Sequence, residues 1–115
     1  MNYLRALTGV VIDPGHGGED SGAIGNGIVE KDLTLDISKY MYERFKELGI
    51  PVALTRDSDS TLTSDNRPRV ALSKFGNGEN VIIISNHINA GGGELSCHYK
   101  ETGWVLRYIN KFYKL

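Results

Sequence analysis

Two short apolar runs, each followed closely by a histidine, constrain the fold of this chain more than any other feature. Residues 10–12 are Val-Val-Ile and His16 follows after an Asp-Pro-Gly turn, while residues 81–84 are Val-Ile-Ile-Ile and precede His87. Continuous β-branched runs are typical of strands that are buried on both faces of a parallel sheet. Because ligands bind at the carboxyl ends of such strands, we expect His16 and His87 to lie at the same edge.

The segments between the two runs alternate helix and strand signals. Residues 31–48 carry an apolar stripe typical of an amphipathic helix on a sheet, and residues 52–55 then form a second strand. The stripe consists of Leu33, Ile37, Met41, Phe45 and Leu48. A short helix over residues 68–75 begins with Pro68 and ends at a glycine. Right-handed crossovers then place the second and third strands on opposite sides of the first. The predicted fold is α/β and three-layer, with a small, mainly parallel twisted sheet and helices on both faces.

The last part of the chain, residues 94–115, follows a different pattern. Residues 95–99 predict a fourth strand. Large apolar residues then recur at helical spacing up to the last residue, which predicts an amphipathic helix packed on the sheet. They are Trp104, Val105, Tyr108, Ile109, Phe112 and Tyr113. A contact of this face with sugar or with a partner chain is the less favoured alternative, and His98 is interpreted as structural.

Composition limits the class of protein. The 115 residues form one predicted domain, and the net charge of −1 with dispersed basic residues argues against nucleic-acid binding. Cys97 is the only cysteine, so the chain has no internal disulfide and no cysteine-rich metal site. The first residues do not form a signal peptide, and no apolar run reaches the length of a membrane span.

A third polar residue, Glu30, completes a candidate metal site. It follows the glycine-rich segment 15–27 and lies where the first helix begins. Two imidazoles and one carboxylate suit zinc and leave a fourth position for water, as in catalytic zinc sites. Taken singly, His16 is as readily a loop histidine, Glu30 a first-turn acid and His87 the end of a strand, so the prediction depends on their coincidence.

Several segments resemble the zinc-dependent N-acetylmuramoyl-L-alanine amidases of bacterial autolysins and phage endolysins. The matching segments are IDPGHGGEDSGA at 12–23, VEKDLTLDIS at 29–38, LTRDSD at 54–59, the pattern Leu62, Arg67 and Ala71, and ISNHINAGGG at 84–93. The match covers residues 10–93, whereas residues 94–115 diverge. The resemblance implies that His16, Glu30 and His87 bind Zn²⁺. It also implies that the substrate is the peptidoglycan amide between muramic acid and L-alanine.

The resemblance also suggests residues near the substrate. Arg67 corresponds to a family arginine beside the site, and we predict that Arg67 and Asn89 bind substrate. A surface cation near a helix start is an equally good interpretation of Arg67. A phosphate-binding loop is a weaker alternative for the glycine-rich segment, which lacks the Lys-Ser or Lys-Thr of a P-loop.

One family feature is absent. The family's general acid and base is a second glutamate in a downstream segment resembling LVELGFLSN, and this C-terminally shortened sequence contains no such segment. The catalytic acid or base is therefore unknown. The predicted function is zinc-dependent hydrolysis of peptidoglycan in the cell envelope or outside the cell. The alternative is a truncated relative that is catalytically impaired and acts as a zinc- or cell-wall-binding module. An open sheet edge would also favour a homodimer.

Overall fold

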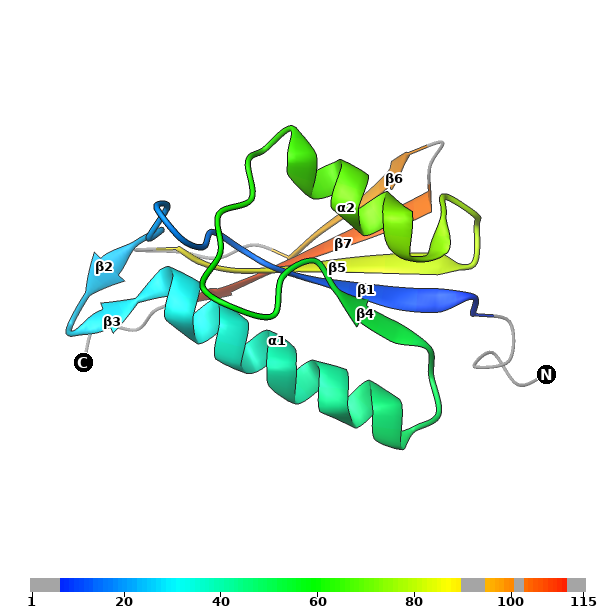
Figure 1. The fold of residues 1–115 in the computed structure, drawn as a ribbon, viewed down its shortest axis with the longest axis horizontal. Coiled ribbons are helices and arrows are strands. Elements are labelled where there is room, and N and C mark those ends of the chain that lie inside the picture. The colour runs from blue at the N-terminus through cyan, green and yellow to red at the C-terminus, as the bar shows by residue number, and fades with distance from the viewer. Residues whose placement is uncertain (1–6, 90–94, 101–102, 112–115) are drawn as a thin grey trace.

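The computed structural model describes residues 7–89, 95–100 and 103–111, and its centre is a five-stranded sheet with one helix on each face (Figure 1). The strand order is β4-β1-β5-β7-β6. The bounds are β1 Gly9–Pro14, β4 Val52–Leu54, β5 Val81–Asn89, β6 Leu95–Lys100 and β7 Gly103–Lys111. Four of these strands are parallel, and β6 alone is antiparallel to its neighbour β7. The three-layer α/β fold with a mainly parallel sheet is confirmed.

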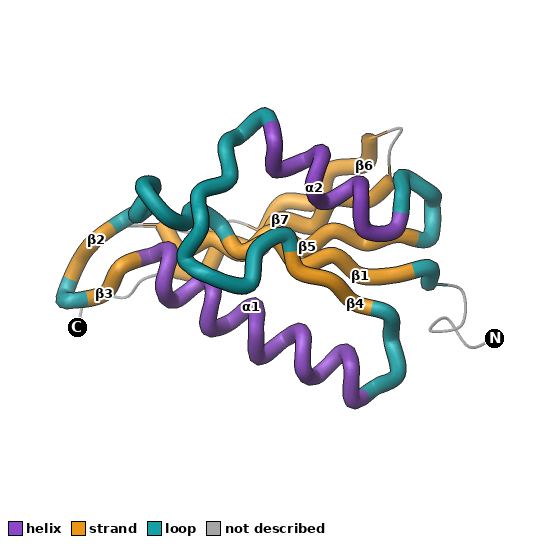
Figure 2. Tube along the Cα trace, in the orientation of Figure 1, coloured by secondary structure: helices purple, strands orange, loops and turns teal. Residues whose placement is uncertain are grey.

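Two crossovers place the helices on opposite faces. The chain passes from β1 through α1 (Glu30–Glu47) to β4, and from β4 through α2 (Asn66–Phe75) to β5. As predicted, β4 and β5 pair with opposite edges of β1, in parallel register. The connections that follow β1 and β4 therefore begin at the same end of the sheet (Figure 2). This arrangement brings His16 and the segment after β4 together.

The core has two parts because side chains of β1 alternate between the sheet's two faces. Val10 and Ile12 pack toward α1, and Val11 packs toward α2. The partly buried residues on the α1 side include Met41, Tyr42, Phe45, Leu54 and Ile84, and those on the α2 side are Phe75 and Ile83. All three β1 side chains are at most 1% exposed, so β1 is the buried strand that its sequence predicts.

The prediction of a C-terminal amphipathic helix is wrong, because residues 103–111 form strand β7. This strand pairs in parallel with β5 and antiparallel with β6, which confirms the strand predicted at 95–99. Trp104 and Tyr108 lie four residues apart, a spacing that suits a helix. Aromatic and β-branched residues also favour strands, and pairing with β5 and β6 decides between the two. Phe112 and Tyr113 of the predicted helix lie outside the described residues.

Helix α1 differs from the prediction in what it buries. Leu48, predicted to complete the apolar stripe, follows the last helical residue and is 58% exposed. The most buried side chains of α1 are polar: Glu30, Thr34 and Ser38 are at most 2% exposed. They lie four residues apart, and hydrogen bonds join Thr34 to Gly15 and Ser38 to Asn86. The polar face of α1 therefore covers the loop end of β1 and the polar part of β5.

A short hairpin that the sequence did not suggest leads into α1. Strands β2 (Ile24–Gly25) and β3 (Ile28–Val29) pair antiparallel, and Glu30 follows β3 directly. In the described part of the chain, neither helix is both long enough and apolar enough to cross a membrane.

Candidate metal centre

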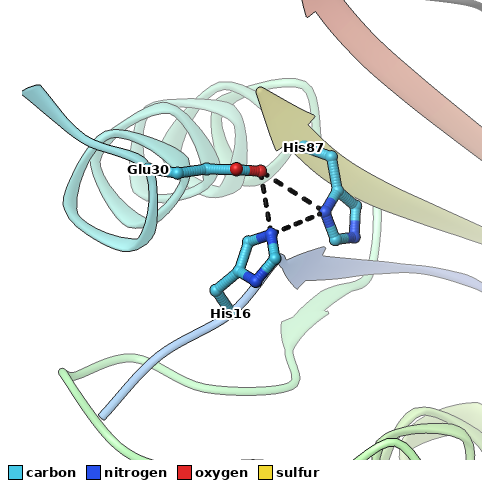
Figure 3. A group of neighbouring side chains, drawn as sticks. All are labelled: His16, Glu30 and His87. Atoms are coloured by element: carbon cyan, nitrogen blue, oxygen red, sulfur yellow. Dashed lines mark hydrogen bonds and ion pairs between the residues drawn. The ribbon is translucent and has the colours of Figure 1, made fainter. Parts of the chain in front are cut away.

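The three side chains that the sequence predicts as zinc ligands come together at one end of the sheet, where the connections that follow β1 and β4 begin. His16 lies two residues after β1, Glu30 is the first residue of α1, and His87 lies within β5 (Figure 3). His16 Nε2 is 2.9 Å from Glu30 Oε2 and 3.2 Å from His87 Nδ1. His87 Nδ1 is 3.5 Å from Glu30 Oε2. One atom of each residue therefore faces a common point, as Figure 3 shows.

The spacing of these donor atoms fits a zinc ion. Zinc–nitrogen and zinc–oxygen bonds of about 2.0–2.1 Å in a tetrahedron place neighbouring donors about 3.3 Å apart. The three separations of 2.9, 3.2 and 3.5 Å bracket that value. Two imidazoles and a carboxylate also belong to the ligand types that zinc accepts. These three residues could therefore hold zinc with little movement.

Main-chain amides fix the carboxylate of Glu30. Its Oε1 accepts a hydrogen bond from the Ala23 amide at 2.9 Å, and its Oε2 accepts one from the Ile88 amide at 2.8 Å. The residue is only 2% exposed. A buried carboxylate needs a positive partner to offset its lost hydration, and a cation held by the three side chains would supply that charge.

A carboxylate orients the ring of His16. His16 Nδ1 lies 2.8 Å from Oδ2 of Asp20, and this hydrogen bond, followed by one from the Gly22 amide, lowers the pKa of Asp20. An ionised carboxylate only accepts hydrogen bonds, so a metal-bound His16 would carry its proton on Nδ1, toward Asp20. Its Nε2, which faces Glu30 and His87, would then be available to the ion. A carboxylate behind a ligating imidazole is a common second partner in metal sites.

The main chain of His16 has an unusual conformation. Its φ is +64°, in the left-handed region, which costs a non-glycine residue about 1–2 kcal/mol. Gly15 and Gly22 then allow close packing around the ring. A Cβ on Gly15 would lie 2.6 Å from His87 Cε1, and one on Gly22 would lie 2.7 Å from His16 Cδ2. The glycines of this segment therefore make room for the two imidazoles.

Asp13 and Arg67 form a buried polar network beneath the loop. Asp13 accepts hydrogen bonds from Thr55 Oγ1 at 2.7 Å, Arg67 at 2.8 Å and Ser85 Oγ at 2.9 Å. The guanidinium of Arg67 also donates to three main-chain carbonyls, those of Pro14, His16 and Leu62. These contacts give Arg67 a structural task. Substrate binding by Arg67 stays a prediction, and the side chain of Asn89 lies outside the described residues.

Sequence reasoning missed Arg56. It follows β4 by two residues, is 4% exposed and donates to carbonyl oxygens of the loop that carries His16. The segment LTRDSD was matched to the family, but no role was predicted for Arg56. Its position just after a strand that pairs in parallel with β1 was an available signal, because the neighbouring loop that carries His16 begins at the same end of the sheet.

Comparison with known proteins gives a consistent result. Residues 10–103 match the profile of the family described as N-acetylmuramoyl-L-alanine amidase. The germination-specific N-acetylmuramoyl-L-alanine amidase of Bacillus subtilis is 37% identical over 93 residues, which covers 70% of this chain and 38% of that protein.

Solved structures are similar as well. The N-acetylmuramoyl-L-alanine amidase AmiC2 of Nostoc punctiforme matches with a TM-score of 0.64 and 38% identity, over 74% of this chain and 45% of that one. The catalytic domain of CwlV, an N-acetylmuramoyl-L-alanine amidase from Bacillus (Paenibacillus) polymyxa, matches with a TM-score of 0.63 and 35% identity, over 72% and 46%. The chain thus spans less than half the length of each of these three proteins.

Proposed function

The chain belongs to the N-acetylmuramoyl-L-alanine amidase family, and from this we propose that it acts on peptidoglycan as a zinc-dependent hydrolase. The proposed substrate is the amide between N-acetylmuramic acid and the L-alanine of the stem peptide. The proposed zinc ligands are His16, Glu30 and His87. The observation that carries the proposal is the convergence of these three donor atoms at separations of 2.9–3.5 Å.

Each residue has a defined task in this proposal. Bound at such a site, zinc supplies Lewis acidity, which polarises a carbonyl and makes water more acidic. The Glu30 carboxylate supplies negative charge, and its two amide hydrogen bonds keep it in place. Asp20 keeps the proton of His16 on Nδ1, so that Nε2 is available. Side chains of both histidines are 22% exposed, which leaves the site accessible from solvent.

The protonation of the leaving amine is the step for which no residue is proposed. Glu30 is the only carboxylate in the three-residue group, and its task is to bind the metal. General acid-base help contributes about 10²- to 10⁴-fold to a rate.

The test is hydrolysis of purified muropeptides by the zinc-loaded protein. The assay detects new amino-terminal L-alanine and the matching free muramic acid product by mass spectrometry. The matched control is His87→Ala, because it removes one proposed ligand and leaves the other two. Release above this control supports the proposal, and equal release by the two proteins contradicts it.

The second candidate function is a module that binds zinc or cell wall without hydrolysis. Within the described residues, Glu30 is the only carboxylate in the group formed with His16 and His87, and a metal ligand set of this kind is all that such a module needs. Such a module would sediment with insoluble peptidoglycan and release no L-alanine terminus. The amidase would release that terminus, so the two functions differ in one measurable product.

The proposed substrate also suggests where the protein acts and with what. Peptidoglycan as a partner implies the cell envelope or the outside of the cell. We also propose a homodimer, since β4 lies at an edge of the described sheet and an edge strand can pair with another chain. Light scattering that reports a single-chain mass at every accessible protein concentration would contradict the dimer.

A further inference from the structure

We infer that Arg56 and Arg67 are positioning residues that hold His16 in the orientation its role as a metal ligand requires. This inference rests on the zinc site proposed above. The two arginines come from different parts of the fold, since Arg56 follows β4 and Arg67 lies in the first turn of α2. Both guanidinium groups donate hydrogen bonds to the main chain of residues 14–16.

The conformation of His16 needs such support. A non-glycine residue with φ of +64° persists only where its surroundings fix it. Gly17 and Gly18 follow with φ values of 128° and 58°, and glycine backbones have many alternative conformations. The segment would therefore relax unless other groups held its carbonyls. A relaxed segment would turn Nε2 of His16 away from Glu30 and His87.

Arg67 holds two of these carbonyls. One of its terminal nitrogens donates to Pro14 O at 2.7 Å, and the other donates to His16 O at 3.0 Å. The first nitrogen also bonds Asp13 Oδ1 at 2.8 Å, which anchors the guanidinium to β1. These two carbonyls lie on either side of the Gly15–His16 segment, so Arg67 restrains the segment that contains the strained residue from both sides.

Arg56 holds the carbonyl between them. Its NH2 group donates to Gly15 O at 3.0 Å and its Nε to Pro14 O at 3.3 Å, while further bonds reach Lys31 O and Ser58 O. Four of its acceptors are main-chain carbonyls and one is the Thr34 hydroxyl at 3.4 Å, so Arg56 mainly organises the backbone around it. Burial, followed by the charge of Arg67, lowers the pKa of Arg56, yet a guanidinium stays protonated in proteins.

The geometry requires arginine in particular. The carbonyls of Pro14, Gly15 and His16 are consecutive along the chain, and the two guanidinium groups together take all three. The planar guanidinium group of arginine donates hydrogen bonds in two or more fixed directions at once. A lysine ammonium keeps the positive charge but is a single point, so it cannot hold two carbonyls in a fixed relative direction.

The first test compares the zinc affinities of Arg56→Lys, Arg67→Lys and the wild type, by competition with a chromophoric chelator. We expect each lysine variant to bind zinc about 10- to 100-fold more weakly, as for other residues that orient a ligand. The matched control is Arg69→Lys, an exposed arginine on the same helix as Arg67, with an expected change of less than about twofold. Urea unfolding of each protein establishes that the affinity is measured on folded chains. Wild-type affinity in folded Arg56→Lys and Arg67→Lys would overturn the inference.

The second test uses the wild type alone and so does not depend on the folding of a variant. Hydrogen exchange is followed at the amides of Gly17 and Gly18 in zinc-free protein. These amides donate to Asp20 O and Asp59 Oδ1, respectively. If the arginines hold the segment, both amides are protected before zinc is added. Exchange at the rate of an unfolded chain, with protection only after zinc addition, would mean that the metal orders the segment and would overturn the inference.

The two tests separate this inference from the proposed function. A wild type that fails to bind zinc removes the proposed function, and the exchange of Gly17 and Gly18 still reports whether the loop is ordered without the metal, as the inference requires. A wild type that binds zinc with unchanged affinity in both lysine variants leaves the zinc site standing and removes only the positioning role.

Discussion

Nε2 of His16 and Oε2 of Glu30 lie 2.9 Å apart, although a loop and a hairpin separate the two residues along the chain. Gly22 lies between them in space as well as in sequence. A Cβ on Gly22 would be 2.7 Å from His16 Cδ2 and 2.8 Å from the Cβ of Glu30. The residue also has a φ of +65°. The close approach of the two proposed ligands therefore depends on the absence of a side chain at position 22.

Gly22→Ala is expected to lower both stability and zinc affinity. The added methyl group meets two crowded side chains and a left-handed backbone, which together cost about 1–3 kcal/mol of the free energy of unfolding. Urea unfolding of the zinc-free protein measures this loss. Gly25→Ala is the control, because nothing lies within 4 Å of a Cβ at that position. Equal stability of the two variants would contradict the prediction.

Glu30→Gln is expected to abolish stabilisation by zinc. The amide side chain keeps an oxygen for the Ala23 amide but loses the negative charge that a divalent cation needs. A ligand present at 100 times its dissociation constant stabilises a protein by about 2.7 kcal/mol. Thermal unfolding with and without zinc should show that shift in the wild type and none in Glu30→Gln. The exposed Glu43→Gln on the same helix is the control and should respond to zinc as the wild type does.

Much of the fold and the three converging residues could be predicted because their signals are local. The β-branched runs of β1 and β5 are typical of strands in a parallel sheet, and a histidine follows each run closely. The crossover rule then placed β4 and β5 on either side of β1. Once the strands were parallel, His16 and His87 had to lie at the same end.

Other features depended on contacts that a single sequence does not reveal. Strand β7 was predicted as a helix because the spacing of Trp104 and Tyr108 suits both structures, and only pairing with β5 and β6 selects the strand. The buried role of Arg56 was missed for a similar reason. A charged residue in a polar segment is usually solvated, and Arg56 is buried because loop carbonyls surround it.

Asp20→Ala is expected to weaken zinc binding without unfolding the protein. Asp20 is 62% exposed, so its removal disturbs little packing, but His16 loses the acceptor that keeps its proton on Nδ1. Loss of such a partner typically lowers metal affinity about 10- to 100-fold. Chelator competition measures the affinity, and Asp57→Ala, another exposed aspartate, is the control. Unchanged affinity in Asp20→Ala would show that the ring needs no orienting carboxylate.

The last prediction concerns the pKa of Asp59 and its contact with Lys31, the second residue of α1. Asp59 accepts hydrogen bonds from Lys31 Nζ at 2.9 Å and from the Gly18 amide at 2.7 Å, and these bonds, that from Lys31 first, lower the pKa of Asp59 from its ordinary value. A lowered pKa means that this contribution to stability is fully present above the unfolded pKa of about 3.9 and is lost as the pH falls through the folded value. Carbon-13 NMR titration of zinc-free protein should therefore give Asp59 a lower pKa in the wild type than in Lys31→Met. The Gly18 amide remains in that variant, so its Asp59 pKa rises only part of the way. Equal values in the two proteins would mean that the contact between Lys31 and Asp59 does not form in solution.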